Sequence, residues 1–124
     1  MGAGFKADAE KLPWRLLPFD ALDQVIAVLA FGVAKYTRYE GCTCAASGLT
    51  RHSPTCGGRL VSGAGNWEKV QDGHARYMDA AMRHMRARYG GEILDSESGL
   101  PHLAHAACCC LFSLAFDLRK KEDN

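Results

Sequence analysis

Apolar side chains recur at helical spacing in three stretches of the chain and predict three main helices, over about residues 19–37, 73–89 and 99–119. The first apolar stripe consists of Leu22, Ile26, Leu29, Val33 and Tyr36. The second consists of Met78, Met82, Met85 and Tyr89, and is ended by Gly90 and Gly91. Gly32, inside the first helix, costs about 1 kcal/mol relative to alanine, which favours a close helix contact there.

The third predicted helix is apolar on every side. Ser98 is a candidate N-cap, and Pro101 suits a first-turn position. One face of the helix carries Leu103, Ala107, Cys110, Leu114 and Leu118, and the opposite face carries His102, His105, Cys109, Phe112 and Phe116. A helix that is apolar all round is buried all round. Because a single chain with three helices has too little material to cover it, the pattern predicts a homodimer or homotetramer.

The remaining segments lack helical periodicity. Residues 1–18 form a polar arm, and residues 38–65 form a long Cys/Gly-rich loop in which "RLVSG" is a candidate short hairpin arm. The predicted fold is therefore all-α: a small bundle of three main helices with an N-terminal arm and a long loop. At 124 residues the chain is expected to form a single domain over residues 1–124.

Charge and hydropathy exclude several classes of function. The balance of 15 Lys+Arg against 14 Asp+Glu gives no basic surface for nucleic acid. No run of 18 or more apolar residues predicts a membrane span, and the first residues lack the apolar segment of a secretory leader. The expected location is the cytoplasm, which is the host cytoplasm if the chain is encoded by a phage.

Two histidines on the third helix are the first candidate site. His102 and His105 are three residues apart, so both imidazoles lie on one side of the helix. His84 on the second helix can supply a third imidazole, and Asp95 and Glu97 can supply carboxylates. Such a set predicts a catalytic metal site. The alternative is that each histidine only satisfies a buried hydrogen bond and organises packing.

The cysteines divide into two groups. Cys108, Cys109 and Cys110 lie inside an apolar helix and are interpreted as reduced, small core residues. The loop holds a possible tetrahedral structural zinc site, made of Cys42, Cys44, His52 and Cys56. A disulfide such as Cys44–Cys56, or free loop thiols, remain alternatives.

Basic and aromatic residues supply candidates for nucleotide binding. The basic residues that could hold phosphates together are Lys6, Lys11, Arg15, Lys35, Lys69 and Arg83. Tyr36, Asn66 and Trp67 flank the loop and are candidates for contact with a base. For any one of the cations the alternative is a solvated surface charge, and for Trp67 it is a place in the core.

Three segments carry a resemblance to a known family. They are "FKADAEKLPWRLLPFDALDQVIAVLAFGVAKY", "NWEKV" and "RYMDAAMRHMRARYGGEILDSESGLPHLAHAACC", in that order. With them the chain resembles the phage-borne dATP/dGTP diphosphohydrolase family, in the wider all-α MazG-like pyrophosphohydrolase class. The resemblance covers nearly the whole chain except the cysteine loop.

The resemblance implies metal-dependent hydrolysis of dGTP or dATP to the monophosphate and pyrophosphate. It implies Mn²⁺, Mg²⁺ or Co²⁺ at His84, Asp95, Glu97, His102 and His105, with Glu97 as the base that activates water, and phosphate contacts from Lys6, Lys11, Lys35 and Arg83. MazG-like enzymes typically hold Mg²⁺ with Glu-Glu-x-x-Glu and Glu-x-x-Asp motifs. This sequence has neither, and His102-x-x-His105 stands in the place of the second. Histidines suit Mn, Fe, Co, Ni or Zn better than Mg.

Two other functions remain open from the sequence. One is a different metal-dependent phosphohydrolase, such as a monophosphatase, that uses the same histidines. The other is a non-catalytic oligomeric phage protein in which the histidines are structural and the loop zinc is the only metal.

Overall fold

The computed structural model describes residues 10–41 and 57–122, and in this part the protein is mainly helical. The three main helices are α1 (Phe19–Tyr36), α2 (Gly73–Tyr89) and α3 (His102–Glu122). Two short 3-10 helices, η1 (Trp14–Leu16) and η2 (Asn66–Lys69), precede α1 and α2. The all-α prediction with three main helices is confirmed. No helix of the described part is long and apolar enough to cross a membrane.

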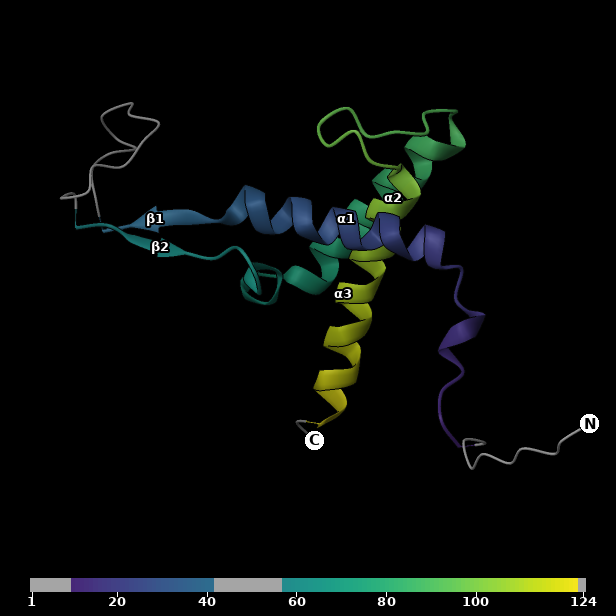
Figure 1. Cartoon of the computed structure of the whole chain (residues 1–124), viewed down its shortest axis with the longest axis horizontal. Helices are drawn as coiled ribbons and strands as arrows, with labels where there is room; N and C mark the ends of the chain where they lie inside the picture. The colour runs from purple at the N-terminus through teal and green to yellow at the C-terminus, as the bar shows by residue number, and fades with distance from the viewer. Residues whose placement is uncertain (1–9, 42–56, 123–124) are drawn as a thin grey trace, which may run out of the picture.

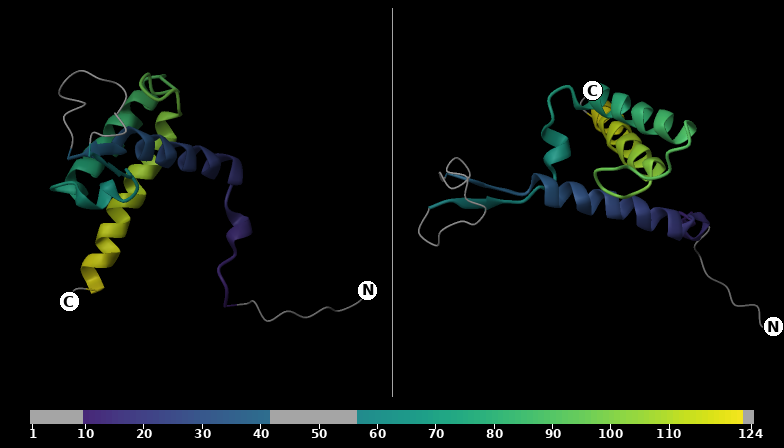
Figure 2. Two further views of the ribbon diagram at one scale, coloured as in Figure 1. Left: turned by 60° about the vertical axis from the view of Figure 1, so that its left-hand side comes forward. Right: turned by 90° about the horizontal axis from the view of Figure 1, so that it is seen from above.

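The helices form a hairpin crossed by a third element. α2 and α3 run antiparallel side by side, and α1 lies across α3 (Figures 1 and 2). The buried centre of this crossing is made of Val25 and Val28 from α1 with Ala104 and Cys108 from α3. Small residues on α3 allow α1 to approach closely, so this core is compact but thin.

A second, aromatic cluster joins η2 to the α2–α3 hairpin. The Trp67 indole stacks on Phe112 with ring centroids 4.5 Å apart, and Tyr77 meets Phe112 edge-on at 5.0 Å. The Tyr77 hydroxyl donates a hydrogen bond to the Trp67 carbonyl at 3.1 Å. Gly73 begins α2 against the Phe116 ring, where an added Cβ would lie 3.2 Å from the ring atoms.

The predicted loop over residues 38–65 contains regular structure. Its ends pair as a two-stranded antiparallel ribbon, β1 (Arg38–Glu40) with β2 (Arg59–Val61), which projects from the end of α1 (Figure 1). The hairpin arm predicted at "RLVSG" is thus present as β2. Cys42, Cys44, His52 and Cys56, the predicted zinc ligands, lie outside the described residues.

Several local predictions differ from the structure. α3 begins at His102 rather than at residue 99, and Ser98 does not cap it, because its hydroxyl bonds to a loop aspartate instead. Within the described part, nothing lies within 4 Å of a Cβ added at Gly32, so the expected close contact there is absent.

The faces that the helices bury also differ from the apolar stripes. On α2, Met82 is 66% exposed and Tyr89 is 95% exposed, while Ala81 is buried. On α1 the buried residues are Val25 and Val28, whereas Ile26 is 54% exposed. The helices pack through small residues because these permit close approach, and the larger apolar side chains remain on the surface of the single chain.

Candidate functional site

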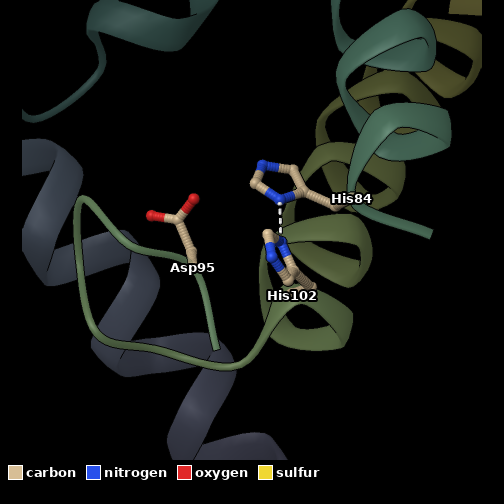
Figure 3. A group of neighbouring side chains, drawn as sticks. All are labelled: His84, Asp95 and His102. Carbon is tan, nitrogen blue, oxygen red and sulfur yellow. Dashed lines mark hydrogen bonds between the residues drawn. The ribbon is translucent and has the colours of Figure 1, made fainter. Parts of the chain in front are cut away.

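The antiparallel pairing of α2 and α3 places the last turns of α2 beside the first turn of α3. His84 on α2 therefore faces His102 on α3, and their Nδ1 atoms lie 2.8 Å apart (Figure 3). The two rings are tilted by 44° with centroids 5.1 Å apart. His102 is only 5% exposed, so its side of this contact is buried.

The loop between α2 and α3 folds back on itself and delivers a carboxylate to the imidazoles. Asp95 N–H donates to the Leu100 carbonyl at 2.8 Å, and Gly99 N–H donates to the Asp95 carbonyl at 2.8 Å. Gly99 has φ +73°, a conformation that favours glycine. One ring nitrogen of His84, one of His102 and one carboxylate oxygen of Asp95 all lie within 4.8 Å of one another.

A serine connects this carboxylate to the other histidine of α3. Ser98 donates its backbone N–H and its hydroxyl to Asp95 Oδ2, at 2.9 and 3.0 Å. The same hydroxyl lies 2.6 Å from His105 Nε2. Because a hydroxyl has one proton, and here it is given to the carboxylate, His105 donates its Nε2–H to Ser98.

The protonation states suit a cation. Burial, followed by the neighbouring imidazoles of His105 and His102, holds the pKa of His84 below its ordinary value. Burial also lowers the pKa of His105, although Asp95 opposes this. Burial alone would raise the pKa of Asp95, but the hydrogen bonds from Ser98 outweigh it and the pKa is lowered. Near neutral pH, His84 and His105 are therefore neutral imidazoles and Asp95 is an ionised carboxylate, the forms that bind metals.

The set of donors indicates which cation fits. Two imidazole nitrogens and one carboxylate form the 2-His-1-carboxylate combination that suits first-row transition metals. Mg²⁺ favours oxygen ligands and retained water. The residues present therefore fit Mn²⁺ or Co²⁺ better than Mg²⁺.

The other two predicted metal ligands lie beside the three that converge. The His105 ring stacks on His84, with centroids 4.6 Å apart, and its Nε2 is 3.8 Å from Asp95 Oδ2. Glu97 turns away to an ion pair with Lys35, whose Nζ lies 2.7 Å from Glu97 Oε1. This hydrogen bond raises the pKa of Lys35 and ties the end of α1 to the loop that carries Asp95.

The predicted nucleotide-binding residues are less closely gathered. Lys35 and Tyr36 are at the exposed end of α1, with the Lys35 ammonium 5.6 Å from the centre of the Tyr36 ring. Arg83 is exposed on α2 next to His84. Lys11 is exposed on the arm before η1, and Lys6 lies outside the described residues.

Asn66 and Trp67 form the start of η2. The Trp67 indole stacks on Phe112, and the Arg119 guanidinium lies over it at 5.1 Å. These contacts favour the core position that the sequence left open for this residue.

Two residues of the site were not assigned to it from the sequence. Ser98, interpreted as a helix cap, instead holds Asp95 and His105 together. Glu92 lies beside His102, with its Oε1 3.1 Å from Nε2. The spacing of both from the histidines gives no helical signal, because they belong to a loop whose shape depends on irregular backbone hydrogen bonds within it.

The fold and this site together define a small all-α protein with a candidate cation centre flanked by basic side chains. The chain belongs to the family described as dATP/dGTP diphosphohydrolase, N-terminal, whose model matches residues 1–124. The resemblance drawn from the sequence motifs is thereby confirmed, and it supports nucleotide diphosphohydrolase chemistry in general. No curated protein and no solved structure matches the chain.

Proposed function

We propose that the chain hydrolyses dGTP or dATP to the monophosphate and pyrophosphate with a divalent cation held by His84, Asp95 and His102. The observation that carries the proposal is the convergence of their ligand atoms within 4.8 Å, in a chain of the dATP/dGTP diphosphohydrolase family. When bound, the cation would neutralise phosphate charge and help to ionise the attacking water.

The surrounding side chains can bind and orient the substrate. Glu97, on the loop that carries Asp95, accepts the proton of the attacking water in this proposal. Its present partner Lys35 then turns to the phosphates, and Arg83 approaches them from α2. The Lys35–Glu97 pair is exposed, at 43% and 60% of the two side chains, so exchanging it for a phosphate contact costs little.

The remaining contacts follow the family resemblance. Lys6 and Lys11 reach the triphosphate from the N-terminal arm, and Tyr36 and Asn66 meet the base. Trp67 follows Asn66 in η2, and its ring remains stacked on Phe112. In this proposal Trp67 supports base binding by holding Asn66 in position.

A panel of substrates and metals tests this function. The protein is incubated with each of the four deoxynucleoside triphosphates and with Mg²⁺, Mn²⁺, Co²⁺ or Zn²⁺, and the products are separated by chromatography. We expect equal amounts of monophosphate and pyrophosphate from dGTP or dATP, fastest with Mn²⁺ or Co²⁺. Release of orthophosphate would assign a different phosphohydrolase reaction. If no triphosphate is consumed with any metal, the proposal fails.

We also propose that the active form is a homodimer or homotetramer. An apolar groove of about 380 Å³ runs between α1 and α3 and is lined only by apolar side chains and Cys110. On α3, Leu111 and Leu114 are 49% and 51% exposed at this groove in the single chain. In this proposal the groove and these exposed leucines form the surface on which a second copy packs.

The loop zinc is a separate proposal. Three thiols and an imidazole, from Cys42, Cys44, Cys56 and His52, match a tetrahedral structural site. Metal content by elemental analysis should show zinc that survives replacement of His102 but is lost on replacement of Cys42 and Cys56. Zinc retained by the cysteine variants would reject the loop site.

A further inference from the structure

Within residues 10–41 and 57–122, His102 has no hydrogen-bond partner for its Nε2 atom. Its Nδ1 faces His84, but its Nε2 is buried and accepts or donates no hydrogen bond among the described residues. Glu92 Oε1 lies 3.1 Å from this nitrogen, but the two atoms do not form a hydrogen bond in this arrangement. A buried polar atom without a partner costs about 1–3 kcal/mol. This nitrogen therefore needs a partner, and the Glu92 carboxylate is a candidate.

The number of protons on the two imidazoles indicates which kind of partner this nitrogen needs. A neutral imidazole carries a single N–H. Across the 2.8 Å contact between the two Nδ1 atoms, only one of them can carry the proton. For both Nδ1 atoms to bind one cation, His84 and His102 must each carry the proton on Nε2. On His102 that N–H is buried, and it requires an acceptor.

The backbone keeps Glu92 in place to be this acceptor. Its N–H donates to the Ala87 carbonyl at 3.1 Å, which fixes it at the end of α2. The preceding Gly91 has φ +103°, so the chain turns sharply there. One residue later, the Ile93 carbonyl accepts the backbone N–H of His102 at 2.9 Å. Glu92 and His102 are thus held side by side by two backbone hydrogen bonds, one on each side of Glu92 in the chain.

We propose that Glu92 is a positioning residue for the metal centre: its exposed carboxylate turns from its present contact at 3.1 Å to accept the Nε2–H of His102, and so directs the Nδ1 lone pair toward His84 and Asp95. The inference rests on the proposed metal-dependent function and adds a partner to its site. Carboxylates that orient a ligating histidine in this way typically change metal affinity 10–100-fold when removed. The Glu92 side chain is 57% exposed, so its own desolvation is small.

The experiment is a titration of the full chain with Co²⁺ alone, followed by visible absorption, for the wild type, Glu92→Gln and Glu92→Ala. We expect Glu92→Ala to bind Co²⁺ about 10–100-fold more weakly. Glu92→Gln keeps a neutral acceptor and should fall between the two. The matched control is Glu40→Gln, which removes a carboxylate of similar exposure on the ribbon and should leave Co²⁺ affinity unchanged.

A second readout follows the tautomer directly. In the metal-free wild type, ¹⁵N NMR of the histidines should show His102 protonated on Nε2 and His84 donating its Nδ1–H to His102. This measurement holds even if a Glu92 variant fails to fold. A His102 proton on Nδ1 in the wild type, or Co²⁺ affinity of Glu92→Ala within twofold of the wild type, would overturn the inference.

The two proposals fail in different ways. If the wild type hydrolyses dGTP or dATP and Glu92→Ala binds Co²⁺ as tightly, the positioning role is rejected and the function stands. If the wild type binds Co²⁺ and Glu92→Ala weakens it, but no triphosphate is consumed, the positioning role stands and the function is rejected. A wild type that binds no Co²⁺ rejects the positioning role together with the metal site.

Discussion

Asp95 takes part in two sets of contacts at once. Its carboxylate faces the imidazoles of His84 and His102, and it also accepts two hydrogen bonds from Ser98. The hydrogen bonds keep the carboxylate ionised, and it brings a negative charge that an imidazole cannot supply. A single residue thus determines both the geometry and the net charge of the candidate centre.

Replacing this charge is the sharpest test at the residue scale. Asp95→Asn keeps the shape of the side chain and part of its hydrogen bonding to Ser98. We expect Mn²⁺ affinity and the rate of pyrophosphate release each to fall by about 100-fold or more, because a ligand and its charge are lost together. Calorimetric titration and product chromatography measure the two effects.

The control for this change is Asp79→Asn, an exposed aspartate on α2. It should retain the wild-type affinity and rate. Full activity of Asp95→Asn would show that the carboxylate takes no part in the reaction.

Cys108 and Tyr77 make folding sensitive to alkaline pH. Burial raises the pKa of the Cys108 thiol from 9.0 to about 12, and burial raises the pKa of Tyr77 from 10.0 to about 12. The unfolded chain therefore loses these protons at lower pH than the folded chain does. Stability that depends on the neutral thiol is complete below pH 9 and is lost as the pH rises toward 12.

The corresponding prediction compares denaturant unfolding at pH 8 and pH 10.5. Cys108→Ala should be less stable than the wild type at pH 8, by about 1 kcal/mol. At pH 10.5 the wild type should have lost about 2 kcal/mol through this thiol, at about 1.4 kcal/mol per pH unit, and the difference should vanish or reverse. Cys110→Ala, at an exposed cysteine, should follow the wild-type pH dependence. Parallel curves for wild type and Cys108→Ala would contradict the buried thiol.

Among the elements, the ribbon depends on one close approach to α1. Gly63 lies just after β2, and an added Cβ there would collide with the Val33 carbonyl oxygen and the Thr37 backbone. The Gly63 N–H donates to Thr37 Oγ1 at 2.9 Å, and this hydroxyl donates to the Val33 carbonyl at 2.6 Å. Lys35, which pairs with Glu97 on the loop that carries Asp95, lies between Val33 and Thr37 in the sequence, so the same turn of α1 contacts both the ribbon and that loop.

Gly63→Ala should therefore destabilise the protein by about 1–3 kcal/mol, the usual cost of overpacking. The matched control is Gly32→Ala in α1, where the described part leaves open space for a Cβ. It should stabilise the protein by up to about 1 kcal/mol, because alanine favours the helix. Thermal unfolding measures both variants. Equal shifts in the two would show that Gly63 is not closely packed.

The α2–α3 hairpin shows how far patterns along the sequence reach at this scale. The helical periodicity of the apolar residues located both helices, and the predicted all-α fold class is also confirmed. It did not identify the buried face of α2, because Met78, Met82 and Met85 form a clear stripe and yet remain exposed in the single chain. Which stripe is buried depends on the shape of the neighbouring helix, which is a property of the pair.

At the scale of the whole molecule, the single chain leaves much apolar surface uncovered. The groove between α1 and α3 is continuous with exposed leucines along α3. At about 25 cal/mol per Å² of apolar surface, covering such faces with a second copy is a substantial gain in stability. Association and folding are therefore expected to be coupled, and stability should depend on protein concentration.

Leu114→Asp tests this association. A charge in the groove would be buried without a partner, so the affinity between copies should fall by about 100-fold or more. Sedimentation equilibrium should show a dimer or tetramer for the wild type and a monomer for the variant. Leu60→Asp replaces an equally exposed leucine on the ribbon and should leave the assembly unchanged. A monomeric wild type would reject the oligomer.

The helices, the family and the residue types of the candidate centre could all be predicted from the sequence. These depend on spacing and composition within short segments, where a helix has a fixed period. The contact of His84 with His102, the ion pair of Glu97 with Lys35 and the place of Glu92 beside His102 became visible in the folded chain. The physical reason is that each of these contacts joins side chains brought together by the packing of α1 and α2 against α3 or by the fold of the connecting loop, and neither is a periodic property of one segment.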